Sequence, residues 1–113
     1  MPSFKPSDTP VEVLHYEMLQ EQASALGRLA RGLEAALEDL RAFDAAHPRA
    51  EAEAARQARG ALIAVAGHAL WMLTVQREAC GLRETRGLMR DYKVPPEVQD
   101  RMGIFPARQG RSL

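Results

Sequence analysis

The sequence predicts an all-α protein, a long antiparallel helical hairpin followed by short C-terminal helices, which we expect a second copy to complete as a dimeric four-helix bundle. The chain is rich in alanine and only 5% aromatic, a composition that favours helix over sheet. Leucines recur at every seventh position over a long stretch, and Pro48 separates that stretch from a second helical one.

The 113 residues are enough for one domain. Residues 1–8 contain two prolines and no periodicity, so we expect a flexible arm there. Residues 9–103 are interpreted as a single helical domain, and residues 104–113 as a flexible tail.

The first helix is expected to begin after Asp8 or Thr9, either of which can cap it, with Pro10 in its first turn. It should end near residues 44–46, because Pro48 disfavours helical geometry at the residue before it. Its core-facing stripe consists of Leu19, Leu26, Leu33 and Leu40, joined by Ala23, Leu29, Ala30, Ala36, Leu37 and Phe43.

The second helix is expected to run from about Arg49 to at least Ala79, and it has two packing faces. One face carries Ala55, Leu62, Val65, Ala69 and Met72. The other, which we predict to be the dimer interface, carries Gly60, Ala64, Gly67 and Trp71. The first helix covers only one face, so a second copy is expected on the other. The alternative is that the C-terminal segment folds back and covers that face within one chain.

Beyond the hairpin, Gly81 is expected to kink or end the helix, and residues 82–92 to form a further helical stretch. Pro95 and Pro96 predict the start of a short terminal helix that stops at Gly103.

Composition restricts the possible functions. The 15 basic and 15 acidic residues balance, so no global field attracts nucleic acid or an anionic membrane. The longest apolar run, residues 61–75, is too short to span a bilayer. The single cysteine excludes an internal disulfide, and a reducing cytoplasm is therefore the expected location.

Searches for catalytic motifs favour a protein without enzymatic activity. The sequence has no phosphate-binding or dinucleotide-binding glycine loop, no zinc spacing and no nucleophile elbow. We therefore expect no cofactor. One alternative is a metal site, because Glu12 and His15 form the ExxH pair of di-iron bundles. If position i of the hairpin faces about position 93 minus i, His15 lies opposite Glu78 and completes the ligand set.

A second alternative is a nucleic-acid site in the C-terminal segment, where a helix, a tight turn and a short helix follow one another. Its candidate phosphate-binding residues are Arg83, Arg86, Arg90, Lys93 and Arg101. Acidic residues interleave with these cations, which favours a charge-mixed solvated face instead. His68, within the apolar run, is interpreted as a core residue, and Cys80 as a packing residue.

Three stretches resemble a family of small uncharacterised bacterial helical proteins: residues 24–37 (SALGRLARGLEAAL), 75–83 (VQREACGLR) and 90–98 (RDYKVPPEV). This resemblance implies a compact helical protein with no assigned activity, and it transfers no catalytic residue. It directs attention to residues 76–83, where polar groups gather beside Cys80.

The sequence thus favours a cytoplasmic interaction or structural module that pairs with itself and with an unknown protein partner. The alternative is a weak nucleic-acid-binding protein that uses the C-terminal basic segment.

Overall fold

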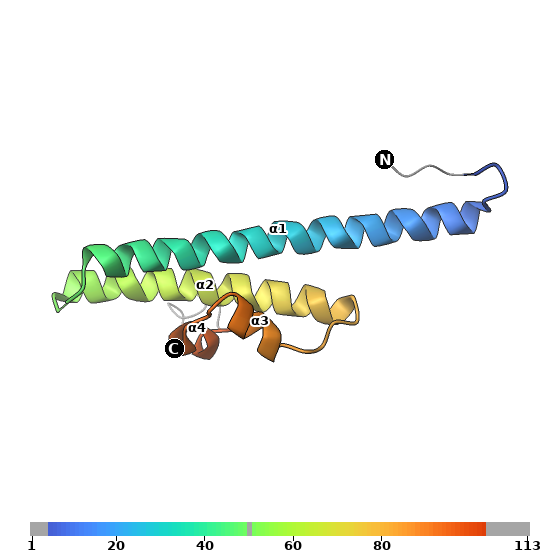
Figure 1. Cartoon of the computed structure of the whole chain (residues 1–113). Helices are drawn as coiled ribbons and strands as arrows, with labels where there is room; N and C mark the ends of the chain where they lie inside the picture. The colour runs from blue at the N-terminus through green and yellow to red at the C-terminus, as the bar shows by residue number, and fades with distance from the viewer. Residues whose placement is uncertain (1–4, 50, 104–113) are drawn as a thin grey trace, which may run out of the picture.

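The computed structural model describes residues 5–49 and 51–103, and within these ranges the protein is all-helical with no strand. Its helices are α1 (Pro10–Ala46), α2 (Glu53–Ala79), α3 (Arg86–Asp91) and α4 (Pro96–Asp100). Helices α1 and α2 form the antiparallel hairpin, and α3 and α4 lie along one side of it (Figure 1). The all-α prediction is therefore confirmed, whereas the dimeric bundle concerns a second copy and stays a prediction.

Helix α1 begins and ends at the predicted places. The Thr9 hydroxyl accepts a hydrogen bond from the Glu12 backbone N–H at 3.1 Å, and the Glu12 carboxylate accepts one from the Thr9 N–H at 3.4 Å. This reciprocal pair satisfies two N–H groups that a helix start leaves unpaired. At the other end, the His47 backbone N–H donates to the Phe43 carbonyl at 2.9 Å, directly before Pro48.

Helix α2 begins at Glu53, four residues later than the sequence suggested. Its N-cap residue, Ala52, has no side chain that could accept a backbone N–H, so no local signal marked the start. The longer turn, residues 47–52, shifts the hairpin register, so that position i faces about position 99 minus i. The helix ends at Ala79, and Gly81 follows the C-cap residue Cys80 with a φ of +87°. The Leu82 N–H donates to the Arg77 carbonyl at 2.8 Å, which completes a glycine-terminated cap.

The C-terminal segment is less helical than predicted, because residues 82–85 lie outside any helix and α3 has six residues. Helix α4 begins after Pro95, with Pro96 in its first turn as predicted. The predicted tail, residues 104–113, lies outside the described residues, as does the beginning of the predicted arm.

The core joins α1, α2 and the C-terminal segment. Its buried residues are Leu33, Ala36, Leu37, Leu40, Ile63, Ala66, Leu70, Leu73, Leu88, Val94 and Val98. Leu33, in the middle of the leucine stripe, has no exposed surface. The stripe is thus the core face of α1, but only its C-terminal half is covered.

An arginine ties three helices together at the closed end of the hairpin. Arg59 of α2 donates to both carboxylate oxygens of Asp44, at 2.7 and 3.2 Å. It also donates to both carboxylate oxygens of Glu97 in α4, at 2.5 and 3.0 Å. These hydrogen bonds lower the pKa of Asp44 and of Glu97, and they raise the pKa of Arg59.

The first turns of α1 extend beyond the end of α2 (Figure 1). Helix α1 has 37 residues and α2 has 27, and at 1.5 Å per residue α1 is about 15 Å longer. We call residues 10–20 of α1 the overhang. Its large apolar residues are exposed, apart from half-buried Val13.

Candidate interaction surface

The face of α2 predicted to bind a second copy is covered within the chain itself. Ala64 is 4% exposed. Gly67 lies so close to Arg101 that a Cβ at position 67 would be 2.8 Å from the Arg101 Cβ, and a Cβ on Gly103 would be 3.3 Å from Trp71. For Gly60, no described atom lies within 4 Å of the Cβ position. The structure therefore corrects the interpretation of this face, since the C-terminal segment covers most of it, as in the alternative considered above.

The other predicted face of α2 is only partly open, because Leu62 and Ala69 pack against the core. Val65 is 56% exposed and Met72 is 39% exposed, because the helix is rotated so that Ile63, Leu70 and their neighbours meet α1 instead. The exposed residues follow one another at alternating spacings of four and three, the repeat of a coiled-coil seam. They are Ala54, Ala58, Ala61, Val65, His68, Met72, Val75 and Ala79, and all but half-buried His68 are exposed.

A second apolar stripe runs along α1. In the overhang, Val11 is 75% exposed, Leu14 58% and Met18 55%. At about 3.6 residues per turn, these three side chains share one side of α1 with Ala25 and Gly32. This side continues past the end of α2.

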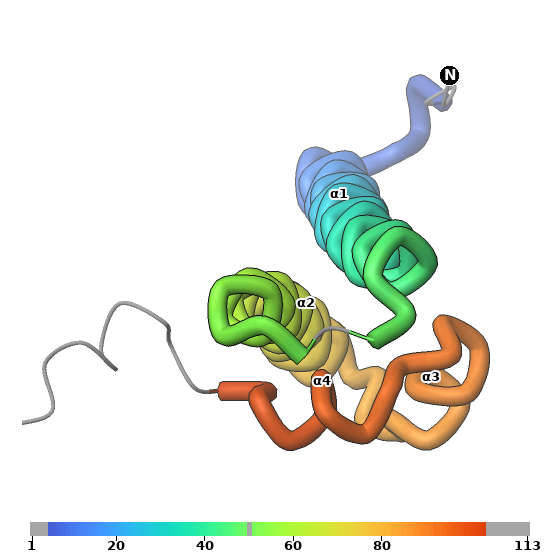
Figure 2. Tube along the Cα trace, turned by 90° about the vertical axis from the view of Figure 1, so that its left-hand side faces the viewer, coloured from blue at the N-terminus to red at the C-terminus, as the bar shows by residue number. Residues whose placement is uncertain are grey.

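The two stripes lie on the same side of the hairpin. Arg41 of α1 reaches the Tyr92 carbonyl at 3.1 Å, and Thr74 of α2 contacts Met102, so these residues mark the side that faces the C-terminal segment. On each helix, the apolar stripe is roughly opposite those residues. Figure 2, which looks along the helices, shows that no described segment covers that side of the α1–α2 pair. We call the two stripes together the open face.

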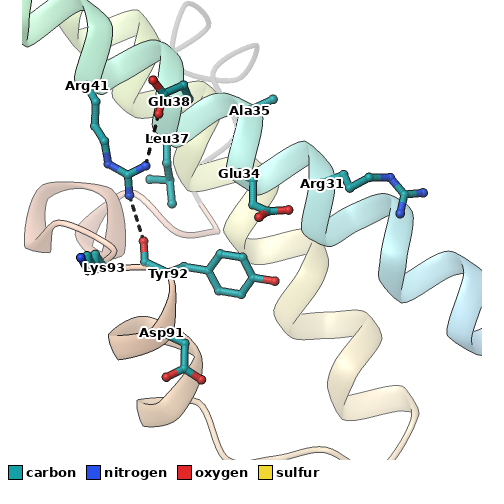
Figure 3. A pocket seen from close by; sticks show the side chains of 9 residues that line it. All are labelled: Arg31, Glu34, Ala35, Leu37, Glu38, Arg41, Asp91, Tyr92 and Lys93. Atoms are coloured by element: carbon teal, nitrogen blue, oxygen red, sulfur yellow. Dashed lines mark hydrogen bonds and ion pairs between the residues drawn. The ribbon is translucent and has the colours of Figure 1, made fainter.

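A shallow hollow lies between α1 and Tyr92 (Figure 3). Its charged lining residues are Arg31, Glu34, Glu38, Arg41, Asp91 and Lys93. Arg41 is engaged by the Tyr92 carbonyl and lies 3.6 Å from the Glu38 carboxylate. Because cations and anions alternate around an open rim, the hollow presents no single charge to a ligand.

The structure does not bring the predicted metal ligands together. With the corrected register, Glu78 faces about position 21, some six residues from His15. The Glu12 carboxylate accepts the Thr9 N–H instead. In the described ranges, no group of three or more His, Cys, Asp or Glu residues could hold a metal ion.

The predicted phosphate-binding residues are also dispersed. Arg101 packs on Gly67, and Arg90 lies 3.7 Å from the Asp91 carboxylate. Arg83, Arg86 and Lys93 are exposed. Helices α3 and α4 have six and five residues, less than two turns each, so neither offers a long reading surface to a DNA groove.

Helix α2 is long and apolar enough, by length and composition, to cross a membrane, with a mean hydropathy of 1.4 over an 18-residue window. This window is longer than the apolar run 61–75, on which the expectation against a membrane span was based. In the fold, 39% of the window is buried inside the protein, and core helices of soluble proteins pass the same test.

Comparisons with known proteins identify a family but no function. The model of a family of unknown function, DUF6665, matches residues 4–110. The chain matches none of the curated proteins and none of the solved structures.

Proposed function

This chain belongs to DUF6665, a family of unknown function, and we propose a function from the surface of the chain itself. The protein is a helical protein–protein interaction module that associates with a second copy through the open face. We propose a cytoplasmic location, since a reducing compartment suits a chain with one cysteine. The proposal includes no catalytic step.

The observation that carries the proposal is the exposure of large apolar side chains in the two stripes of the open face. Contiguous apolar patches of several hundred Å2 mark interaction sites. On the open face, the exposed fractions of the large residues correspond to roughly 500–600 Å2 per copy, and two copies together approach the about 1,200 Å2 at the lower end of stable interfaces. The exposed alanines of α2 add to this area.

Light scattering on the purified chain tests the proposal. We expect a mass of twice the 12.5 kDa chain at concentrations up to about 100 µM, a range that detects even modest affinity. Met18→Glu places a charge on the open face and should give the mass of one chain. Gln20→Glu adds the same charge on another side of α1 and should leave the dimer intact.

Helicity by circular dichroism should be equal in the two variants, since both positions are exposed. A wild-type mass of one chain at about 100 µM would refute self-association.

A further inference from the structure

We infer that the two copies dock antiparallel, with a two-fold axis near Ala25 of α1 and Val75 of α2. The inference rests on the proposed self-association and specifies its geometry. In this arrangement, the overhang of each copy lies along residues 30–40 of the partner's α1.

The distribution of apolar residues along the hairpin places the axis. With position i facing about 99 minus i, Val75 is level with position 24 of α1, and Met72 with position 27. The overhang residues lie on one side of this level, and Val65 on the other. A two-fold axis at this level therefore lays each overhang along the partner's α1 and brings Met72 and Val75 against the same end of the partner's α2, whereas Val65 lies outside the contact.

The sizes of the residues along α1 fit this register. A two-fold axis at Ala25 pairs position i with the partner's position 50 minus i, so that Met18 lies over the partner's Gly32. Gly32 is exposed, and no described atom lies within 4 Å of its Cβ position, so it leaves room for a long side chain. The long side chain of Met18 thus meets a glycine, the smallest residue, on the partner's α1, as interdigitating helices require.

The charges beside the apolar stripe favour antiparallel over parallel pairing. Glu17 and Glu21 lie on the overhang side of Ala25, and Arg28 lies on the other side. In the antiparallel register, each Glu21 is level with the partner's Arg28. In a parallel arrangement, Glu17 and Glu21 would instead lie level with Glu17 and Glu21 of the partner, and the repulsion between like charges would weaken the dimer.

Within one chain, Arg28 and Glu21 are 3.5 Å apart, with side chains 60% and 74% exposed. Both groups are therefore accessible to a partner. An exchange of this intrachain pair for an interchain one keeps the charges compensated and fixes the register.

Pulsed electron resonance on spin-labelled full chains tests the geometry. In a Cys80→Ser background, labels are attached at Ser24→Cys and, separately, at Tyr16→Cys. Antiparallel docking about Ala25 separates the two copies of residue 24 by about 3 Å along the helix axis and those of residue 16 by about 27 Å. Residue 16 labels should therefore be clearly farther apart than residue 24 labels.

Charge exchange provides the second measurement. Glu21→Arg and Arg28→Glu each break the intrachain pair, and each should dimerise more weakly alone, because like charges then meet across the interface. An equimolar mixture should associate more tightly than either variant, since every interchain pair is opposite in sign again. An unlabelled chain that is a monomer would overturn the proposed function together with this geometry. A dimer with equal label separations at residues 16 and 24, or a mixture no tighter than its components, would overturn the antiparallel geometry alone.

Discussion

Replacing Gly67 by alanine tests whether α4 is held against α2 by close backbone contact. The new Cβ would lie 2.8 Å from the Arg101 Cβ and 3.0 Å from its carbonyl carbon and oxygen. Because the carbonyl carbon and oxygen are backbone atoms, no change of side-chain rotamer can relieve this clash. Overpacking of this kind costs about 1–3 kcal/mol, while alanine gains up to about 1 kcal/mol over glycine within a helix.

The net loss expected for Gly67→Ala is therefore about 1–2 kcal/mol. The clash could also be relieved if α4 moved away from α2. That movement would expose fully buried Val98, at a similar cost of about 2 kcal/mol. The matched control is Gly60→Ala in the same helix, where no described atom lies within 4 Å of the Cβ position. That variant should gain about 0.5–1 kcal/mol.

Urea denaturation of both variants at one protein concentration measures the difference in the free energy of unfolding. Hydrogen exchange should show faster exchange at α4 in Gly67→Ala alone. Equal effects of the two substitutions would refute the account of Gly67 as a contact site for the C-terminal segment.

Three further changes test the core, the arginine tie and the rejected metal site. Leu33→Ala should cost about 2–5 kcal/mol in urea denaturation, as truncations of fully buried leucines do, and a loss below about 1 kcal/mol would contradict its core position. The pKa of Glu97 is lowered in the folded state, so its stabilising contribution is present above its unfolded pKa of about 4.3 and is lost as pH falls through the folded value. Glu97→Gln should remove roughly 1 kcal/mol at pH 7, lessened by solvent screening, and should flatten the stability profile below about pH 4.5 relative to wild type. A chelator should leave the melting temperature unchanged, whereas stoichiometric metal that is lost on His15→Ala would restore the di-metal hypothesis.

Local signals made α1 predictable from the sequence. A capping residue, a proline in the first turn and a proline after the end act within a few residues, so they operate regardless of the rest of the fold. The start of α2 had no such signal, because Ala52 has no capping side chain. The resulting four-residue error shifted the hairpin register and produced the false alignment of His15 with Glu78.

The open face of α2 was missed for a different reason. Alanine, valine and leucine occur around most of this helix, so periodicity alone did not decide which side meets α1. The signal was present, since the spacing of the residues from Ala54 to Ala79 is that of a coiled-coil seam. The tie of Arg59 to Asp44 and Glu97 joins residues up to 38 positions apart, a relation that no local pattern indicates.

The shape of a single copy connects the proposed dimer to stability. The radius of gyration is 18.6 Å, whereas a compact chain of this length has one of about 13 Å. Helix α1 alone is about 55 Å long, and the apolar side of its overhang is bare in one copy. If a partner covers that side, association adds to folding stability, and the melting temperature rises with protein concentration. Met18→Glu should abolish this concentration dependence with little change at the dilute limit, while Leu33→Ala should lower the melting temperature at every concentration and retain the dependence. Calorimetry over about a hundredfold range of concentration separates these outcomes, and a wild-type melting temperature that does not vary would refute the coupling between the open face and folding.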